Sequence, residues 1–332
     1  MIALFSTAVD QSTTDVLRWI RRLSPGTAVI RVNSDEPDRV TSLSITNSEF
    51  RFVIDGTNLS SRDLTTVWYR KGRDWLCNVF LPVDAPVAPR VRQYLAAKIR
   101  AEERRLTEFA HAKIAERAWS LGDHEQGDLN KLMVLDLAAT CGLDVPRLLI
   151  SNSKQEIRAI VEDTEAVTKA LSDGLYLFDH EIATRGYYSY TEELKREQLD
   201  ALPPRISPSL TQVRIPKVLE IRVFFLNGRF YPMAIFSQAD DRTRIDFRRY
   251  NETRPNRSVP YRLPGDVEAR LLRLFEELCL NTGSADMILE PDGRYVFLEI
   301  NPSGQFGMVS APCNYYLERE VASTLISHEQ LT

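Results

Sequence analysis

The sequence predicts a mixed protein in which an α/β region is followed by an α+β region. In the first hundred residues, short apolar runs of strand length accompany an amphipathic helix. Beyond residue 121, helices give way to a series of strands that ends in a hairpin. With 332 residues and 43% hydrophobic content, the chain can build a large core and is long enough for two or three domains.

The first hundred residues are predicted to form a small α/β unit. Residues 2–5 form a buried strand, and residues 13–23 form a helix because their apolar side chains recur at helical spacing. Further strands are expected at 28–32, 50–54 and 65–69. The segment that follows the first strand, residues 6–10, contains no glycine. A nucleotide site of the Rossmann type is therefore not expected in this unit.

The rest of the chain divides at charged and proline-rich segments. A helical stretch over 89–120 is predicted to turn these apolar side chains inward: Val91, Tyr94, Leu95, Ile99 and Leu106. Residues 121–128 form a loop, and residues 200–208 are irregular because they are rich in proline. The other expected elements are helices at 131–141 and 265–280 and strands at 147–150, 166–171, 210–215, 218–226 and 229–237. The domain boundaries predicted from this pattern are 1–88, 89–120, 121–200 and 201–332.

Composition excludes several classes of protein. The net charge of -4 does not suit a nucleic-acid-binding protein. The longest apolar run is far shorter than the ~20 residues of a membrane span. The first residues lack the charged and apolar regions of a signal peptide, and the four cysteines show neither metal-type spacing nor disulfide density. A cytoplasmic protein that binds neither membrane nor nucleic acid is expected.

The predicted hairpin, residues 284–302, carries acidic side chains in apolar strands. Asp286 lies in its first strand and Glu299 in its second. Asn301 follows Glu299 by two positions and shares its face of the strand. Burying polar groups without partners costs on the order of 2–7 kcal/mol each, and more for charges. Mg²⁺, which takes oxygen ligands, would remove that cost. Pairing of both acids with nearby arginines is the alternative.

Three basic residues lie where an anion would suit them. Lys131 opens a helix and Lys169 lies within an apolar strand. Glu220 and Arg222 share one face of a strand whose other face is apolar. Arg222 could stabilise a transferred phosphoryl group. The alternatives are a surface position for Lys131, an exposed edge for Lys169, and a structural salt bridge between Glu220 and Arg222.

This order of residues resembles the ATP-grasp ligase fold over about residues 121–327, preceded by the α/β domain usual in that family. The resemblance implies ATP and Mg²⁺ as cofactors. It implies that Lys131 and Lys169 contact the ATP phosphates and that Glu220 reaches the ribose or the polar network of the site. It also implies a hinge whose backbone contacts adenine, formed by Gln212, Val213, Arg214 and Ile215, and magnesium ligands at Asp286, Glu299 and Asn301.

Several segments of the final third, among them 235–238, 245–248, 254–261 and 301–318, resemble the graspetide (microviridin-type) synthetases. These are peptide maturases of the ATP-grasp fold. The resemblance implies that the enzyme phosphorylates Asp or Glu side chains of a ribosomally made precursor peptide. It then closes macrocycles with Ser or Thr as esters, or with Lys as amides. The leader and the acidic core of that peptide would be the binding partners of the enzyme.

An arginine cluster offers partners for the substrate carboxylate. Arg248, Arg254 and Arg257 lie within ten positions of one another, and guanidinium groups suit carboxylates. Asp246 would orient Arg248 or take a proton from the attacking hydroxyl. A solvated basic loop is the alternative.

Two other functions remain open from the sequence. One is an ATP-grasp ligase that joins an amino acid to a separate protein tail or small acid. The other is a scaffold that binds ATP or peptide without catalysis. The identity of the peptide, the ring number and size, the choice of ester or amide, the leader-binding surface and the oligomeric state, with a homodimer as one candidate, are not determined.

Overall fold

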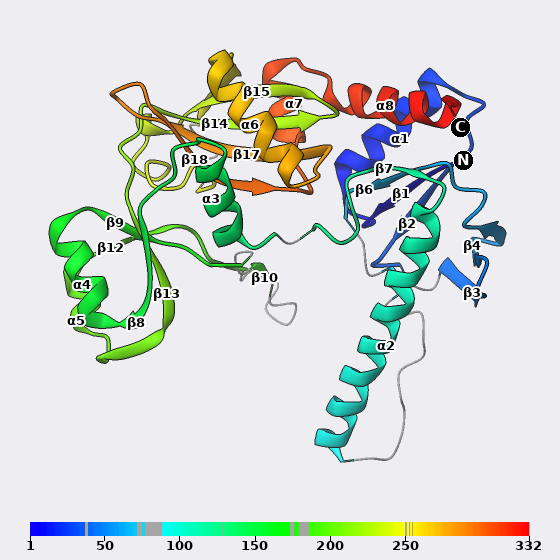
Figure 1. Ribbon diagram of the computed structural model, residues 1–332, viewed down its shortest axis with the longest axis horizontal. Coiled ribbons are helices and arrows are strands. Elements are labelled where there is room, and N and C mark those ends of the chain that lie inside the picture. Colours follow the sequence, from blue (N-terminus) through cyan, green and yellow to red (C-terminus); the bar gives the residue numbers. More distant parts are fainter. Residues whose placement is uncertain are drawn as a thin grey trace. The chain divides into compact units, whose positions relative to one another are not determined.

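The computed structural model describes residues 1–36, 39–71, 75–76, 88–127, 129–172, 176–178, 186–249, 251, 253 and 255–331 (Figure 1). The chain forms two compact units, one of Met1–Gly127 with Tyr316–Thr332 and one of Asp128–Tyr315. The predicted domain over 201–332 differs from this division, because the last helix packs in the first unit.

The first unit contains a parallel four-stranded sheet in the order β2-β1-β6-β7, with strands β1 (Ile2–Ser6), β2 (Val29–Asn33), β6 (Thr66–Tyr69) and β7 (Trp119–Leu121). A separate antiparallel sheet holds β3 (Val40–Ile45), β4 (Phe50–Ile54) and β5 (Thr57–Ser60). The strands expected at 2–5, 28–32, 50–54 and 65–69 are present. β3 and β5 were not predicted, because half or more of their side chains are polar and neither has a continuous apolar run.

Helices α1 (Gln11–Leu23) and α8 (Leu317–Leu331) pack against each other in this unit. Asp10 begins α1 as its N-cap, accepting a hydrogen bond from the Thr13 backbone N–H. On α8 the buried side chains recur at helical spacing, from Leu317 to Ile326. This apolar stripe is what joins the end of the chain to its beginning.

Helix α2 (Pro89–Ala115) differs from the helix predicted over 89–120 in length and in its buried face. The final residues of that range belong to β7 instead. Ala110 and Ile114 are buried against the sheet core, with Leu106 beside them. Val91 and Tyr94, predicted inward, are 46% and 63% exposed. The apolar spacing continues along the whole helix, whereas the core of the first unit lies only along its second half.

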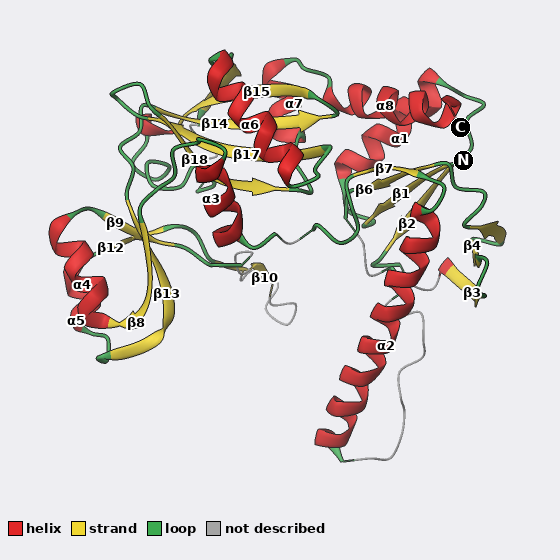
Figure 2. Ribbon diagram, viewed as in Figure 1, coloured by secondary structure: helices red, strands yellow, loops and turns green. Residues whose placement is uncertain are grey.

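Besides a short hairpin, the second unit contains two sheets (Figure 2). One has the order β12-β9-β13-β8, with strands β8 (Leu148–Ser153), β9 (Ala166–Thr168), β12 (Glu192–Leu194) and β13 (Arg205–Val213) and the nearby helices α4 (Lys154–Asp163) and α5 (Arg196–Asp200). A short hairpin is formed by β10 (Tyr176–Phe178) and β11 (Gly186–Tyr188). Residues 205–208, predicted irregular, belong to β13, whose register shifts between Arg205 and Ser209 and so tolerates the proline.

The other sheet is antiparallel, in the order β16-β15-β14-β17-β18. Its strands are β14 (Leu219–Leu226), β15 (Arg229–Phe236), β16 (Arg257–Pro260), β17 (Thr282–Leu289) and β18 (Tyr295–Asn301), with helices α3 (Lys131–Thr140), α6 (Gly265–Glu277) and α7 (Gly307–Cys313). The strands expected at 218–226 and 229–237, the helices at 131–141 and 265–280 and the acidic hairpin are all present.

The two faces of β14 separate core from site. Ile221, Val223 and Phe225 join α3 and α6 in one hydrophobic core. The residues that alternate with them along the strand, including Glu220 and Arg222, face the other way, as the alternation of a strand requires.

A β-bulge in β18 determines which side chains of this strand face the core. Asp286 lies opposite Glu299, but the next residue, Met287, lies opposite Phe297. Leu298 is therefore the extra residue, and the strand reverses its faces there. As a result Phe297 is buried in the core beside α3 and α6, while Glu299 points to the opposite face. Without the bulge these two residues would share a face.

Among the described residues, no helix combines the length and the apolar character needed to cross a membrane.

Candidate active site

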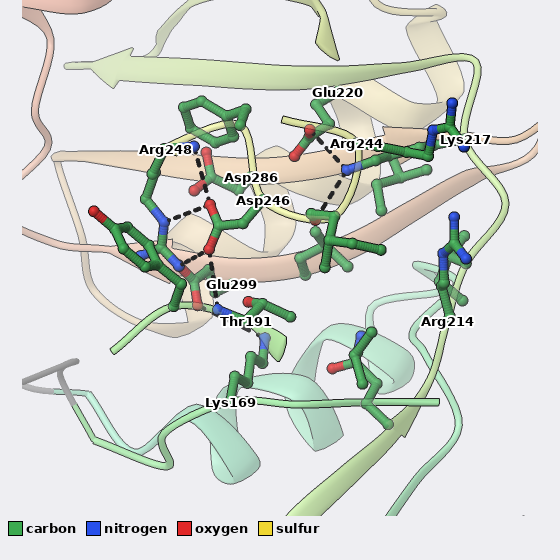
Figure 3. A pocket seen from close by; sticks show the side chains of 18 of the residues that line it. Lys169, Thr191, Arg214, Lys217, Glu220, Arg244, Asp246, Arg248, Asp286 and Glu299 are labelled. Carbon is green, nitrogen blue, oxygen red and sulfur yellow. Dashed lines mark hydrogen bonds and ion pairs between the residues drawn. The ribbon is translucent and has the colours of Figure 1, made fainter. Parts of the chain in front are cut away.

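A cavity of about 930 Å³, including its open mouth, lies in the second unit (Figure 3). It is lined by the end of β9, the hinge between β13 and β14, the loop that follows β15, and the hairpin β17–β18. The lining residues are Lys131, Val167, Lys169, Ala170, Ser189, Tyr190, Thr191, Gln212, Arg214, Ile215, Lys217, Glu220, Arg244, Ile245, Asp246, Phe247, Arg248, Asp286, Ile288, Leu298 and Glu299.

Asp286 forms an ion pair with Arg222 on the neighbouring strand. The two residues are opposite each other in the register of β14 and β17, and Arg222 Nη1 lies 3.1 Å from Asp286 Oδ2. Burial raises the pKa of Asp286 to about 6, although the Arg222 charge works against the rise. The alternative of pairing with an arginine therefore describes Asp286 in this structure.

Glu299 is paired with both predicted phosphate-binding lysines. Its Oε2 atom lies 3.6 Å from Lys131 Nζ and 3.8 Å from Lys169 Nζ. Burial alone would raise the pKa of Glu299, but the two ammonium groups outweigh it and lower the pKa. Burial lowers the pKa of Lys169, against the attraction of Glu299. Strand β9 ends at Thr168, so Lys169 follows the strand rather than lying inside it as predicted.

The hinge side of the cavity combines apolar walls with an unused acceptor. Val167, Ile215 and Ile288 contribute apolar surface. Gln212 is 5% exposed, and its side-chain Oε1 is buried without a hydrogen-bond partner in the part of the chain that the structure describes. A buried acceptor left in this way costs about 1–3 kcal/mol, and a ligand with N–H groups would satisfy it. This wall therefore fits a nucleobase.

The loop between β15 and β16 brings an aspartate and an arginine to the cavity (Figure 3). Arg248 donates to both carboxylate oxygens of Asp246, from Nε at 2.9 Å and from Nη2 at 2.6 Å. The Thr191 backbone N–H donates to Asp246 Oδ2 at 3.1 Å. Burial would raise the pKa of Asp246, but the hydrogen bonds and charge of Arg248 lower it below its usual value. Asp246 is thus a carboxylate that orients Arg248.

Glu220 belongs to a buried polar network rather than standing alone. Lys217 Nζ lies 2.8 Å from Glu220 Oε1, and Ser237 Oγ donates to the same oxygen at 2.6 Å. Burial raises the pKa of Glu220, against the Lys217 charge. Lys217 was not predicted as a site residue, because a lysine after Pro216 and before a strand is typical of a surface turn. Thr191 and Arg244 were missed for the same lack of a local signal.

The structure brings together ten of the predicted site residues at the cavity: Lys131, Lys169, Gln212, Arg214, Ile215, Glu220, Asp246, Arg248, Asp286 and Glu299. Arg222 reaches it through Asp286. Val213 and Asn301 are not among the lining residues, although Asn301 follows Glu299 on β18. The guanidinium of Arg257 lies 5.6 Å from the ring centre of Phe236, outside the cavity. Arg254 lies outside the described residues.

The donor set fits a hard divalent cation. Asp286 and Glu299 offer carboxylate oxygens from opposite positions on one hairpin, and Asn301 adds an amide oxygen on the Glu299 face. Within the described ranges, no group of three or more His, Cys, Asp or Glu side chains is arranged for a metal ion. The hairpin thus supplies two acids, and the remaining ligands would be oxygens from elsewhere, as is usual for Mg²⁺ bound with phosphates.

Solved structures with this fold cover nearly the whole chain. Macrocyclase MdnC from Microcystis aeruginosa MRC, bound with precursor peptide MdnA, has 25% identity and a TM-score of 0.77, covering 98% of this chain and 100% of that one. A RiPP-associated ATP-grasp ligase from Chryseobacterium gregarium, in complex with ADP and with leader and core peptide, has 23% identity and a TM-score of 0.79, covering 98% and 96%. The chain has the ATP-grasp ligase fold and is similar to ligases of the peptide-maturase type.

ATP-grasp ligase PsnB, complexed with minimal precursor, Mg and ADP, has 17% identity, a TM-score of 0.74 and coverage of 98% and 96%. No family model and no curated protein matches the sequence. The sheet of β8, β9, β12 and β13 and the sheet of β14–β18 both contribute residues to the lining of the cavity.

Proposed function

We propose that the chain is an ATP-dependent carboxylate ligase that closes macrocycles in a ribosomally made precursor peptide. The observation that carries this proposal is the convergence in one cavity of two lysines, two acids of the hairpin and the Asp246–Arg248 pair. The lysines and the hairpin acids would hold the phosphates, and the Asp246–Arg248 pair would hold the substrate carboxylate. The similarity over the full chain to a macrocyclase bound with its precursor peptide supports the choice of substrate.

In this proposal the nucleotide base lies against the hinge and the phosphates lie toward the hairpin. The N–H groups of Val213 and Arg214 already donate within the lobe, to Arg147 O at 2.9 Å and Glu165 O at 2.8 Å. Adenine would therefore use other hinge groups, among them the side-chain oxygen of Gln212. Lys131 and Lys169 would leave Glu299 and contact the phosphate oxygens instead.

Asp286, Glu299 and Asn301 are the proposed magnesium ligands. A bound Mg²⁺ would neutralise phosphate charge during transfer. Arg222, 3.1 Å from Asp286, would hold a fixed positive charge beside the transferred group.

The reaction begins at a substrate carboxylate held by Arg248. A carboxylate does not condense with an alcohol in water, because hydroxide is a poor leaving group. Transfer of the γ-phosphoryl group of ATP to a carboxylate oxygen forms an acyl phosphate and ADP. A Ser or Thr hydroxyl, or a Lys amine, of the same peptide then attacks the acyl carbon and releases phosphate. Holding both groups on one peptide supplies much of the rate.

Asp246 is proposed to keep the Arg248 guanidinium in place and to accept the proton of the attacking group. Its lowered pKa suits the first role, since it stays ionised at neutral pH. A reaction that consumes ATP and a newly made peptide belongs in the cytoplasm, which is the location we propose.

Intact mass spectrometry tests this function. The protein is incubated with ATP, Mg²⁺ and an acidic, Ser/Thr-containing peptide encoded beside its gene. We expect ATP-dependent loss of one water per ring, because each condensation removes one water and adds no residue. Mild base should reverse the loss where the linkage is an ester.

A mass gain in the same experiment would instead establish an intermolecular ligase that adds an amino acid or tail. An unchanged peptide with its leader intact, together with unchanged ATP, would contradict the proposed activity on this peptide.

A further inference from the structure

The residues Ser237–Arg249 form a loop, here named the arginine loop, that carries Asp246 and Arg248 into the cavity. Two contacts from outside the loop hold its far end. The Thr191 backbone N–H donates to Asp246 at 3.1 Å, and Lys217 Nζ donates to the Ile245 carbonyl oxygen at 3.2 Å. Figure 3 shows the lysine between Glu220 and the arginine loop. The Ile245 carbonyl immediately precedes Asp246, so its position affects both functional residues.

Lys217 is almost completely enclosed where it makes these contacts. Its side chain is 8% exposed, and its ion pair with Glu220 measures 2.8 Å. The other end of the arginine loop joins the same network, because Ser237 Oγ donates to Glu220 at 2.6 Å and Thr243 Oγ1 donates to the Ser237 carbonyl at 2.7 Å. Both ends of the loop are therefore tied to one buried charge pair.

The position of Lys217 in the chain also links the arginine loop to the hinge. It lies between β13 and β14, in the hinge that covalently joins the two lobe sheets and lines the proposed base site. The next residue, Val218, is fixed to the hairpin sheet by a hydrogen bond from its N–H to Leu289 O at 2.8 Å. Lys217 thus touches the hinge, the acid of β14 and the arginine loop at once.

We propose that Lys217 is a positioning residue that holds the arginine loop in register with the nucleotide site. This inference rests on the proposed function, in which Arg248 binds the substrate carboxylate that receives the phosphoryl group. The lysine fixes the Ile245 carbonyl relative to the hinge, and the hinge fixes the base. A small displacement of Arg248 from the γ-phosphate would slow transfer strongly, because transfer depends on alignment of the reacting atoms.

The alternative explanation is that Lys217 only neutralises Glu220. Removing the partner of a buried acid strongly destabilises the folded protein, whereas removing both charges together often leaves its stability unchanged. The two explanations therefore give different results when both charges are removed, because the donor to Ile245 is lost in that case as well.

The test compares the full-length wild-type protein with Lys217→Met, Lys217→Arg and the double variant Lys217→Met/Glu220→Gln. Each is assayed for peptide kcat and KM by intact mass, for ADP affinity with Mg²⁺ by calorimetry, and for melting temperature. For Lys217→Met we expect kcat to fall about tenfold or more while ADP affinity stays within about threefold, since one donor that aligns the loop is lost and the base site remains. Lys217→Arg should recover part of kcat, because it keeps the charge and the donors.

The double variant separates positioning from stability. We expect its melting temperature to return toward the wild-type value while kcat stays about tenfold low. It also keeps the test valid if Lys217→Met alone fails to fold. Recovery of kcat to within about threefold of wild type would overturn the proposal and assign Lys217 to charge neutralisation alone.

Lys154→Met is the matched control. Lys154 also bridges two carbonyls, Asp200 O at 3.1 Å and Leu202 O at 2.7 Å, but it lies outside the cavity. Its loss should leave kcat unchanged. A fall in ADP affinity with unchanged kcat for Lys217→Met would overturn the proposal in favour of direct nucleotide binding. Wild-type turnover in the same assay separates these outcomes from a failure of the proposed function.

Discussion

The variants Asp286→Asn and Glu299→Gln are expected to lose peptide modification by about a thousandfold or more, because each removes a charged oxygen ligand proposed for Mg²⁺. Folding should survive, since both replacements keep size and hydrogen-bonding atoms. Initial rates by intact mass, with circular dichroism and melting temperature alongside, measure the effect. Calorimetric titration of Mg²⁺ in the presence of ADP should show weakened metal binding in both variants.

Glu290→Gln is the matched control on the same hairpin. Glu290 is a buried acid that pairs with Arg294 at 3.0 Å, and it lies outside the cavity. Its loss should affect stability alone. If Asp286→Asn and Glu299→Gln kept wild-type turnover, the metal assignment would be wrong.

The variant Arg248→Lys is expected to reduce kcat/KM for the peptide by about a hundredfold, because a lysine cannot form the two-pronged contact that a guanidinium makes with a carboxylate. It would also lose the paired hydrogen bonds to Asp246 that orient the side chain. ADP affinity should change little, because Arg248 faces the proposed acceptor rather than the base. Steady-state kinetics and ADP calorimetry on the same preparation test both statements.

Arg270→Lys serves as its control. Arg270 is an arginine of α6 that contacts Asp266 at 2.7 Å and the Gly142 carbonyl, away from the cavity. An equal loss of peptide kcat/KM in both variants would show that the effect of Arg248→Lys is not specific to carboxylate binding.

Much of the sheet framework could be predicted from the sequence, because the expected strands are marked by apolar runs or strict alternation, whereas β3 and β5 are not. In β14, Glu220 and Arg222 were correctly placed on one face opposite an apolar face. The convergence of Asp286 and Glu299 was also predictable, since a short turn brings the two strands of a hairpin together.

Other parts of the site depend on contacts that sequence spacing does not contain. The bulge at Leu298 separates Phe297 from Glu299 and becomes evident only from the pairing register. The pairing of Glu299 with both Lys131 and Lys169 joins three elements that are far apart in the chain. Lys217 has no local signal, because its role comes from a loop that folds back onto the hinge.

The most direct test of the central claim, carboxylate activation by ATP, uses a peptide whose Asp and Glu carboxylates carry oxygen-18. The labelled peptide is incubated with protein, ATP and Mg²⁺, and the released phosphate is analysed by phosphorus NMR. The proposed acyl phosphate predicts that one labelled oxygen passes from the peptide into phosphate for each ring formed. Ring formation with unlabelled phosphate would contradict the account, because the phosphoryl group would then never have been attached to the carboxylate.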